Sequence, residues 1–197
     1  MASIIKVDDV QDAAGNNIIN EAGDVITIGG SGDTINIASG ATNNLGITEA
    51  DQWRLDTTFT GDANPIASNL ERVDTTGFGR IGTGMTESSG IFTFPSTGIY
   101  LVSFNWFGAF TAAQLYCSST IELTTNDSSY AAVSSGNAQS YASSAYSTSM
   151  SQYMVDVTDV ANVKVRFFVD AVGSSTSTVG SSTNTHTGFT FIRLGDT

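Results

Sequence analysis

Apolar side chains recur at every second position through most of this chain. The pattern is clearest in two segments, whose apolar residues are Tyr100, Val102, Phe104 and Trp106 in the first and Val163, Val165, Phe167 and Val169 in the second. Successive side chains of a strand point to opposite faces of a sheet, so this spacing predicts strands with one buried face. No helical period follows Trp53. Many short strands with turns between them predict an all-β fold, a β-sandwich or jelly roll.

Further strands are expected where β-branched and aromatic residues cluster between turn-forming residues. They span residues 55–60, 91–94, 115–123, 152–157 and 189–194. Gly, Asn, Asp and Ser separate these segments, as turns require. A short helical turn is expected at Thr48–Asp51, whose first and last residues have the spacing of a capping box.

The aromatic residues divide the chain into two parts. All 19 of them lie at or after Trp53, whereas the first 52 residues hold none and carry one Lys against eight acids. We therefore expect two regions, an N-terminal arm at residues 1–46 and a globular head at residues 47–197.

A short repeat lies within the arm. The sequence GDVITI at residues 23–28 recurs as GDTINI at residues 32–37. Four isoleucines alternate along the two copies as the face of a strand: Ile26, Ile28, Ile35 and Ile37. Small sheets without a cover are marginal in water, so these isoleucines are expected to trimerise the arm around a shared axis. A disordered acidic tail is the alternative interpretation.

The charge balance and the rare residue types exclude several classes of function. Seven Lys and Arg against 19 Asp and Glu give a net charge of −12, which disfavours binding to nucleic acid. A single cysteine, Cys117, and a single histidine, His186, exclude a disulfide and a Cys/His zinc cluster within one chain. The N-terminus does not resemble a secretory signal. The uncharged stretch 98–110 suits a buried strand better than a spanning helix, so no membrane insertion is expected.

No residue stands out as catalytic, and no cofactor is expected. His186 lies in a loop so rich in Ser and Thr that a neighbouring hydroxyl carries no information, and no Gly-x-Ser-x-Gly motif occurs. Calcium is the one metal considered, with Asp127 and Asp159 as oxygen donors near predicted strand ends. Solvated turn acids are the alternative. A carbohydrate-active enzyme that uses paired carboxylates also stays open, because a sequence does not give their separation.

One segment of the head resembles a known family. The stretch 89–104 contains a Gly-x-Phe-Thr-x-Pro-x-x-Gly-x-Tyr run that ends at Tyr100. It resembles the most recognisable stretch of the complement first-component and tumour necrosis factor superfamily, and residues 155–165 and 186–191 resemble later strands of the same family. The resemblance implies a jelly-roll head that forms a homotrimer.

The arm has a resemblance of its own. Residues 5–12, 15–21, 26–29 and 32–35 are similar to the start of virion fibre and decoration proteins of marine tailed phages. This likeness implies a location in the virion, with the arm attached to other virion proteins. A trimeric phage fibre is the function expected, and a purely structural capsid decoration or cement trimer is the alternative.

The stretch 128–155 carries no charge and is rich in Tyr, Ser and Ala. Tyrosine supplies contact area at low entropic cost on recognition surfaces. We therefore expect Tyr130, Tyr141 and Tyr146 to bind the host surface, with a cell-surface glycan as the possible ligand. The alternative is that these tyrosines line strands or a subunit interface.

Overall fold

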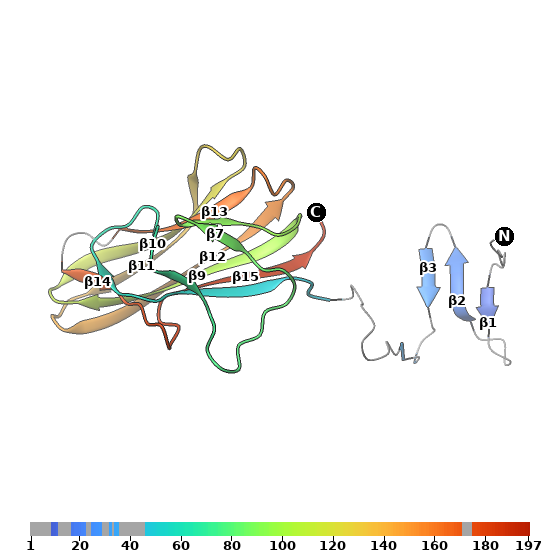
Figure 1. Ribbon diagram of the computed structural model, residues 1–197, viewed down its shortest axis with the longest axis horizontal. Coiled ribbons are helices and arrows are strands. Elements are labelled where there is room, and N and C mark those ends of the chain that lie inside the picture. Colours follow the sequence, from blue (N-terminus) through green and yellow to red (C-terminus); the bar gives the residue numbers. More distant parts are fainter. Residues whose placement is uncertain are drawn as a thin grey trace. The chain divides into compact units, whose positions relative to one another are not determined.

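A computed structural model describes residues 9–11, 17–22, 25–28, 32, 34–35, 46–170 and 175–197 (Figure 1). The chain divides into two compact units, residues 1–43 and residues 44–197. The change in composition predicted this boundary between residues 46 and 47. Every regular element in the described part of the chain is a β-strand. No helix among these residues is long and apolar enough to span a membrane.

The first unit contains a three-stranded antiparallel sheet in the order β1-β2-β3. Its strands are Asp9–Gln11, Asn17–Ala22 and Val25–Ile28. The second copy of the repeat does not form the expected strand at its described positions, because Thr34 and Ile35 lie outside strands. Strand β3, which contains most of the first copy, pairs with β2. Ile37 lies outside the described residues.

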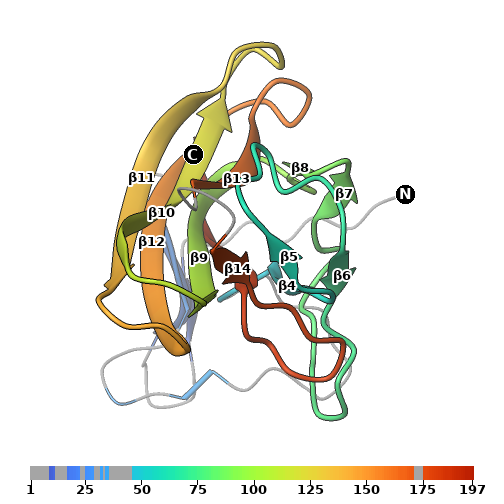
Figure 2. The ribbon, with the colours of Figure 1, turned by 90° about the vertical axis from the view of Figure 1, so that its left-hand side faces the viewer.

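The second unit, which we call the head, is a sandwich of two antiparallel sheets (Figures 1 and 2). One sheet has the order β11-β10-β13-β8-β7, with strands Ala131–Ser140, Gln114–Thr124, Lys164–Asp170, Ile91–Thr93 and Thr86–Ser88. The other has the order β5-β14-β9-β15-β4-β6, with strands Phe59–Thr60, Thr176–Thr178, Gly98–Phe110, Gly188–Gly195, Ala50–Leu55 and Leu70–Arg72. A further strand, β12 (Ala145–Val157), pairs with β9. The expected all-β sandwich is confirmed.

The two ends of the sandwich differ in what they carry. Ala50, at the start of β4, pairs with Ile192 near the end of β15, so the chain enters and leaves the head at one end, which we call the entry end. Strand β9 runs from the entry end and finishes at Phe110, which pairs with Ala145. The turn between β11 and β12 therefore lies at the opposite end, which we call the tip.

An aromatic cluster forms the core between the two sheets. The alternation predicted for β9 and β13 is confirmed, because the apolar residues of both segments are buried. Phe92 of β8 is at the centre, with its ring centroid 5.4 Å from those of Trp53 and Phe167, 5.1 Å from Phe191 and 5.9 Å from Phe189. Offset and edge-on ring contacts of this kind add to the stabilisation from buried area.

Two expected local structures are wrong. The strand expected at residues 55–60 is interrupted, because β4 ends at Leu55 and β5 begins at Phe59. The helical turn expected at Thr48–Asp51 is absent, since Ala50 and Asp51 already belong to β4. Pairing of β4 with β15 outweighs the local capping preference there.

Strand β11 was not predicted, because its residues are mostly Ala, Ser, Gly and Asn, which have low strand propensity. Pairing with β10 along most of its length holds it in the sheet. Its small residues also let it approach the opposite sheet, since a Cβ added at Gly136 would lie 2.7 Å from the carbonyl oxygen of Met150.

Candidate interaction surface

The outward side of the sheet formed by β4, β15, β9 and β12 carries an apolar row. Ala50 pairs with Ile192, Ile192 with Leu101 and Leu101 with Met154, so each strand places one apolar residue in the row. Met154 is 62% exposed. A shallow, open hollow of about 400 Å³ adjoins the row at Leu101, Gln152, Tyr153 and Met154. We call this side of the sheet the outer face.

A polar row follows the apolar one. It consists of Gln52, Thr190, Ser103 and Gln152, paired in that order across the same four strands. Gln52 Nε2 donates to Thr190 Oγ1 at 3.2 Å, and Gln152 Nε2 donates to Ser103 Oγ at 2.9 Å. Because these side chains bond to one another, the row can be covered with a smaller desolvation cost than unpaired polar groups would have.

Three stacked rings lie on the outer face nearer the tip. The Phe107 ring centroid lies 5.5 Å from that of Tyr146 and 5.3 Å from that of His186, with interplanar angles of 5° and 21°. Asn105 Nδ2 donates to the His186 carbonyl at 2.9 Å and thereby fixes the loop that carries His186. His186 is half-buried and stacks against Phe107. The stack presents Tyr146 to solvent.

The row of the outer face that follows the polar row contains one cation, Arg54, which pairs with Gly188. Neighbouring side chains cover Arg54. Its guanidinium is fully buried, bonding Glu71 at 2.8 Å, Asp74 at 2.5 Å and Thr75 Oγ1 at 2.8 Å. Burial acts to lower the pKa of Arg54, but the hydrogen bonds and charges of Glu71 and Asp74 outweigh it and raise the pKa. The outer face is therefore close to uncharged between the apolar row and the ring stack.

The three tyrosines expected to bind the host surface do not lie together. Tyr130 is half-buried near the entry end, 4.2 Å beneath the guanidinium of Arg166, and burial raises its pKa. Tyr141 lies in the turn at the tip and is 76% exposed. Tyr146 belongs to the ring stack on the outer face. Tyr141 and Tyr146 are both exposed, but only Tyr141 lies at the tip, away from the outer face.

Besides the outer face, the head has an exposed apolar feature at its tip, which was not predicted. Leu115 and Tyr116 lie at a β-bulge, where the pairing of β10 with β11 skips from Gln114 to Cys117. Leu115 is 79% exposed, and Tyr116 is exposed as well. Gln114 pairs with Ser140, so the bulge and Tyr141 lie at the same end of the sandwich. We call Leu115, Tyr116 and Tyr141 the tip patch. In the sequence, the adjacent apolar residues Leu115 and Tyr116 break the alternation of apolar and polar positions. This break was the signal that could have indicated the bulge.

The two acids considered for calcium lie in neighbouring turns, and both have protein partners. Asp127 accepts a hydrogen bond from Lys164 Nζ at 2.5 Å. Asp159 accepts from the backbone nitrogen of Ala161 at 2.8 Å and from Asn162 Nδ2 at 2.6 Å. In the described part of the chain, no group of three or more His, Cys, Asp and Glu side chains is placed to hold a metal ion.

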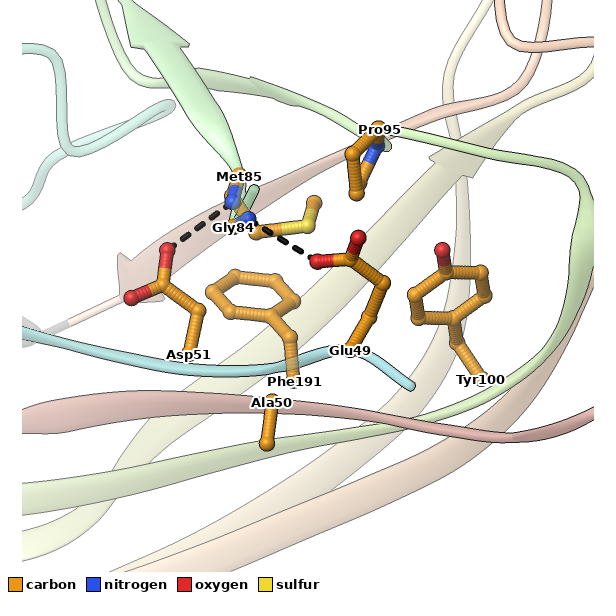
Figure 3. Close-up of a pocket in the computed structure, with 8 residues that line it drawn as sticks. All are labelled: Glu49, Ala50, Asp51, Gly84, Met85, Pro95, Tyr100 and Phe191. Carbon is orange, nitrogen blue, oxygen red and sulfur yellow. Dashed lines mark hydrogen bonds between the residues drawn. The ribbon is translucent and has the colours of Figure 1, made fainter. Parts of the chain in front are cut away.

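Two carboxylates line a small pocket beside β4, but both hold the chain rather than face a substrate (Figure 3). Glu49 accepts from the backbone nitrogens of Thr83 and Gly84 at 3.1 and 2.9 Å. Asp51 accepts from the Met85 nitrogen at 2.9 Å and from Trp53 Nε1 at 2.9 Å. Gly84 has a φ of 76°, and a Cβ there would lie 2.7 Å from Asp51 Oδ2. The pocket leaves no space for a water molecule, so it offers no room for a sugar.

Cys117 is an inert residue of the core. Its side chain is fully buried, and burial raises the pKa of its thiol, although its hydrogen bond to Thr176 Oγ1 acts to lower it. A buried thiol with a raised pKa is a poor nucleophile.

The sequence matches no protein-family model, and a comparison with curated proteins finds no match either. Solved structures do show similarity. Murine APRIL at pH 5.0 aligns with a TM-score of 0.53 and 14% identity, over 74% of this chain and 98% of that chain. Eiger TNF from S. frugiperda aligns with a TM-score of 0.56 and 14% identity, over 77% of this chain and 95% of that chain. The head is an all-β sandwich with the jelly-roll fold of the complement first-component and tumour necrosis factor type.

Proposed function

We propose that this protein is a structural, self-associating module whose heads form a homotrimer through the outer face. The observation that carries the proposal is the absence of charge on the outward side of β9, β12 and β15 between the apolar row and the ring stack, in a chain with a net charge of −12. The apolar row lies on one side of the polar row, and the aromatic ring stack lies on the other side. An apolar surface of this extent marks an interaction site on a soluble protein.

Self-association explains the outer face better than a foreign partner does. Interface cores are depleted in charge and enriched in aromatic residues and Met, as this face is at Phe107, Tyr146, Met150 and Met154. The acids of the head that the structure describes lie mostly in loops and at strand ends, where three copies can keep them in water. Proteins of this fold usually form homotrimers and are typically non-enzymatic, which supports both parts of the proposal.

The mass of the full chain in solution tests the proposal directly. Light scattering at micromolar concentration is expected to give three times the 20.5 kDa of one chain. The mass is expected to hold on dilution to sub-micromolar concentration, since an interface that covers such a face buries enough area for a stable complex. A mass of one chain at all concentrations would overturn the proposal.

We further propose that the trimer is a fibre of a phage particle, anchored by its arm and with its tips outward. The support is the likeness of the arm sequence to virion fibre proteins, together with the two-ended head. The arm joins the head at the entry end, and the tip patch lies at the opposite end. Such a polarity suits a fibre that presents the tip patch to a host surface. A capsid decoration trimer has no need of an exposed tip patch.

Replacing Tyr141 with Ala is expected to weaken adsorption of the purified trimer to host cells. Tyr141 is exposed, and its hydroxyl donates a long hydrogen bond of 3.3 Å to Gln139 Oε1. The free energy of unfolding should therefore change by no more than about 0.5 kcal/mol. The measurement is cell binding of fluorescently labelled trimer, with trimer mass and thermal unfolding in parallel.

Leu194→Ala is the matched control, because Leu194 is also exposed and lies at the entry end. It should bind cells as the parent does. Equal binding by Tyr141→Ala and the parent would remove the host-contact role of the tip. No binding by the parent would favour the capsid decoration trimer.

A further inference from the structure

Two described turns lie at the tip of the head, and neither carries a charge. Residues 111–113 join β9 to β10, and residues 141–144 join β11 to β12. Their sequences are Thr-Ala-Ala and Tyr-Ala-Ser-Ser, and each of these residues is exposed. Gln114 pairs with Ser140, so the two turns lie next to each other, at the end of the head away from the C-terminus (Figure 1). On these sides the tip patch is thus bordered by small uncharged residues.

The bulge in β10 exposes two neighbouring apolar side chains beside these turns. In a regular strand, two successive side chains point to opposite faces of the sheet. The bulge instead leaves both Leu115 and Tyr116 exposed, Tyr116 by 50%. Together with Tyr141 they give the tip patch one branched aliphatic side chain and two aromatic rings. The side-chain polar atoms of the patch are the two tyrosine hydroxyls.

Polar side chains near the patch bond to groups of the head itself. Ser118 Oγ donates to Asn137 Oδ1 at 3.0 Å, and Ser140 Oγ donates to the Ala142 carbonyl at 2.9 Å. A sugar or a protein loop is recognised through hydrogen bonds from side chains that are ready to make them. A lipid bilayer needs no such bonds from the protein. The hydrogen bonds around the patch therefore favour a bilayer as its partner.

Acids lie close to the tip but outside the tip patch. Asp170 of β13 pairs with Ser118, which follows the bulge on β10. Asp62 precedes Ala63, which forms a bridge to Val169 of β13. These acids, and the net charge of −12, repel an anionic surface. A partner of the tip patch is therefore expected to carry no net charge.

Threefold symmetry repeats the tip patch in one plane. Rotation about the axis of the proposed trimer leaves all three tips at the same end of the assembly. Equivalent atoms of the three copies lie in a plane perpendicular to that axis, so a flat surface can contact all three patches at once. Three simultaneous contacts strengthen binding far beyond that of one patch. A bilayer is a flat partner of this kind.

We propose that the tip patch binds the surface of a lipid bilayer that carries no net charge. The inference rests on the proposed trimer with its tips outward, and it names the chemistry of the surface that the tips contact. Leucine favours the hydrocarbon, and tyrosine favours the boundary between hydrocarbon and water, where its ring is buried and its hydroxyl stays wet. The contact is peripheral, because a few side chains enter the boundary region, and it differs from insertion of a spanning segment.

Tryptophan fluorescence of the full chain with Tyr116→Trp tests the contact. The probe is a vesicle of phosphatidylcholine, whose headgroup has no net charge. Trp53 and Trp106 are buried, so their emission should not change when vesicles are added. The new indole is expected to shift its emission to shorter wavelength and to be quenched by lipids that are brominated in their acyl chains. Leu194→Trp is the matched control at the entry end and should show neither change.

Leu115→Asn is expected to lower the vesicle partition coefficient about tenfold or more, because the same apolar side chain is lost three times in one trimer. Leu194→Asn makes the same change at the other end and should bind vesicles as the parent does. Both leucines are exposed, so both variants should keep the fold and the mass of a trimer. Adding anionic phosphatidylglycerol to the vesicles should weaken binding of the parent.

Several outcomes would overturn the lipid contact. These are an unchanged emission of Tyr116→Trp with vesicles, equal partitioning of Leu115→Asn and the parent, or binding that strengthens with phosphatidylglycerol. A trimer that binds host cells but not vesicles would mean that the tip contacts a protein or glycan receptor. The lipid contact would then fail, while the proposed fibre would stand. A parent mass of one chain would overturn the proposed trimer, and light scattering detects that separately.

Discussion

A Leu101→Arg variant is expected to give the mass of a single 20.5 kDa chain, where the parent gives that of a trimer. Leu101 lies in the middle of the apolar row, between Ile192 and Met154. In the trimer, the substitution buries one unpaired cation in each copy and brings three like charges close to one another. A buried charge without a partner costs several kcal/mol, and here the cost arises three times in one assembly. Light scattering across a range of concentrations measures the result.

Leu115→Arg is the control for this experiment. It makes the same chemical change at an exposed apolar residue of the tip patch, away from the outer face. It should keep the mass of a trimer. Both variants should show the far-ultraviolet circular dichroism of a folded β protein, because neither leucine belongs to the buried core. A trimeric Leu101→Arg would mean that the chains associate through another surface.

Replacing Phe92 with Ala is expected to lower the free energy of unfolding by about 3–5 kcal/mol. The Phe92 side chain is fully buried, and four aromatic rings surround it. Their strands belong to both sheets, so the cavity cannot close without moving one sheet against the other. Urea unfolding followed by tryptophan fluorescence measures the change, since Trp53 lies against Phe92. Protomer concentration must be the same for all variants, because association adds to the apparent stability.

Ile81→Ala provides the baseline for the same measurement. Ile81 is exposed and contributes a bridge to Ala50 through its backbone, which the substitution leaves in place. Its cost should stay within about 0.5 kcal/mol. A cost for Phe92→Ala below about 1 kcal/mol would contradict the placement of Phe92 at the centre of the core.

The strands with strong alternation could be predicted from the sequence, and the assembly of surfaces from distant segments could not. The apolar residues of β9 and β13 alternate because one face of each strand packs in the core, and this signal is local. The ring stack combines Phe107 of β9 with His186 from the loop before β15, a contact set by sheet register. No pattern within either segment contains that information.

The arm shows the same limit in a different form. The isoleucine alternation correctly indicated a strand at residues 25–28, but it did not indicate which strand pairs with it. The partner is β2, which has no sequence likeness to β3. Strand pairing depends on the geometry of the turns and on which apolar side chains become buried, and a repeat of six residues determines neither. Similarly, β11 is a strand because β10 pairs with it, in spite of its composition.

The position of β9 in the sheet has a consequence for how the chain reaches its fold. β9 pairs along its whole length with β12, and also with β15 and β14, all of which follow it in the sequence. During synthesis, this uncharged strand of 13 residues therefore emerges before any of those pairing partners exists. Long-range pairing makes folding slow, and an unpaired apolar strand promotes aggregation while it waits. Production of this protein should accordingly benefit from slow synthesis at low temperature and from chaperones that bind extended apolar segments.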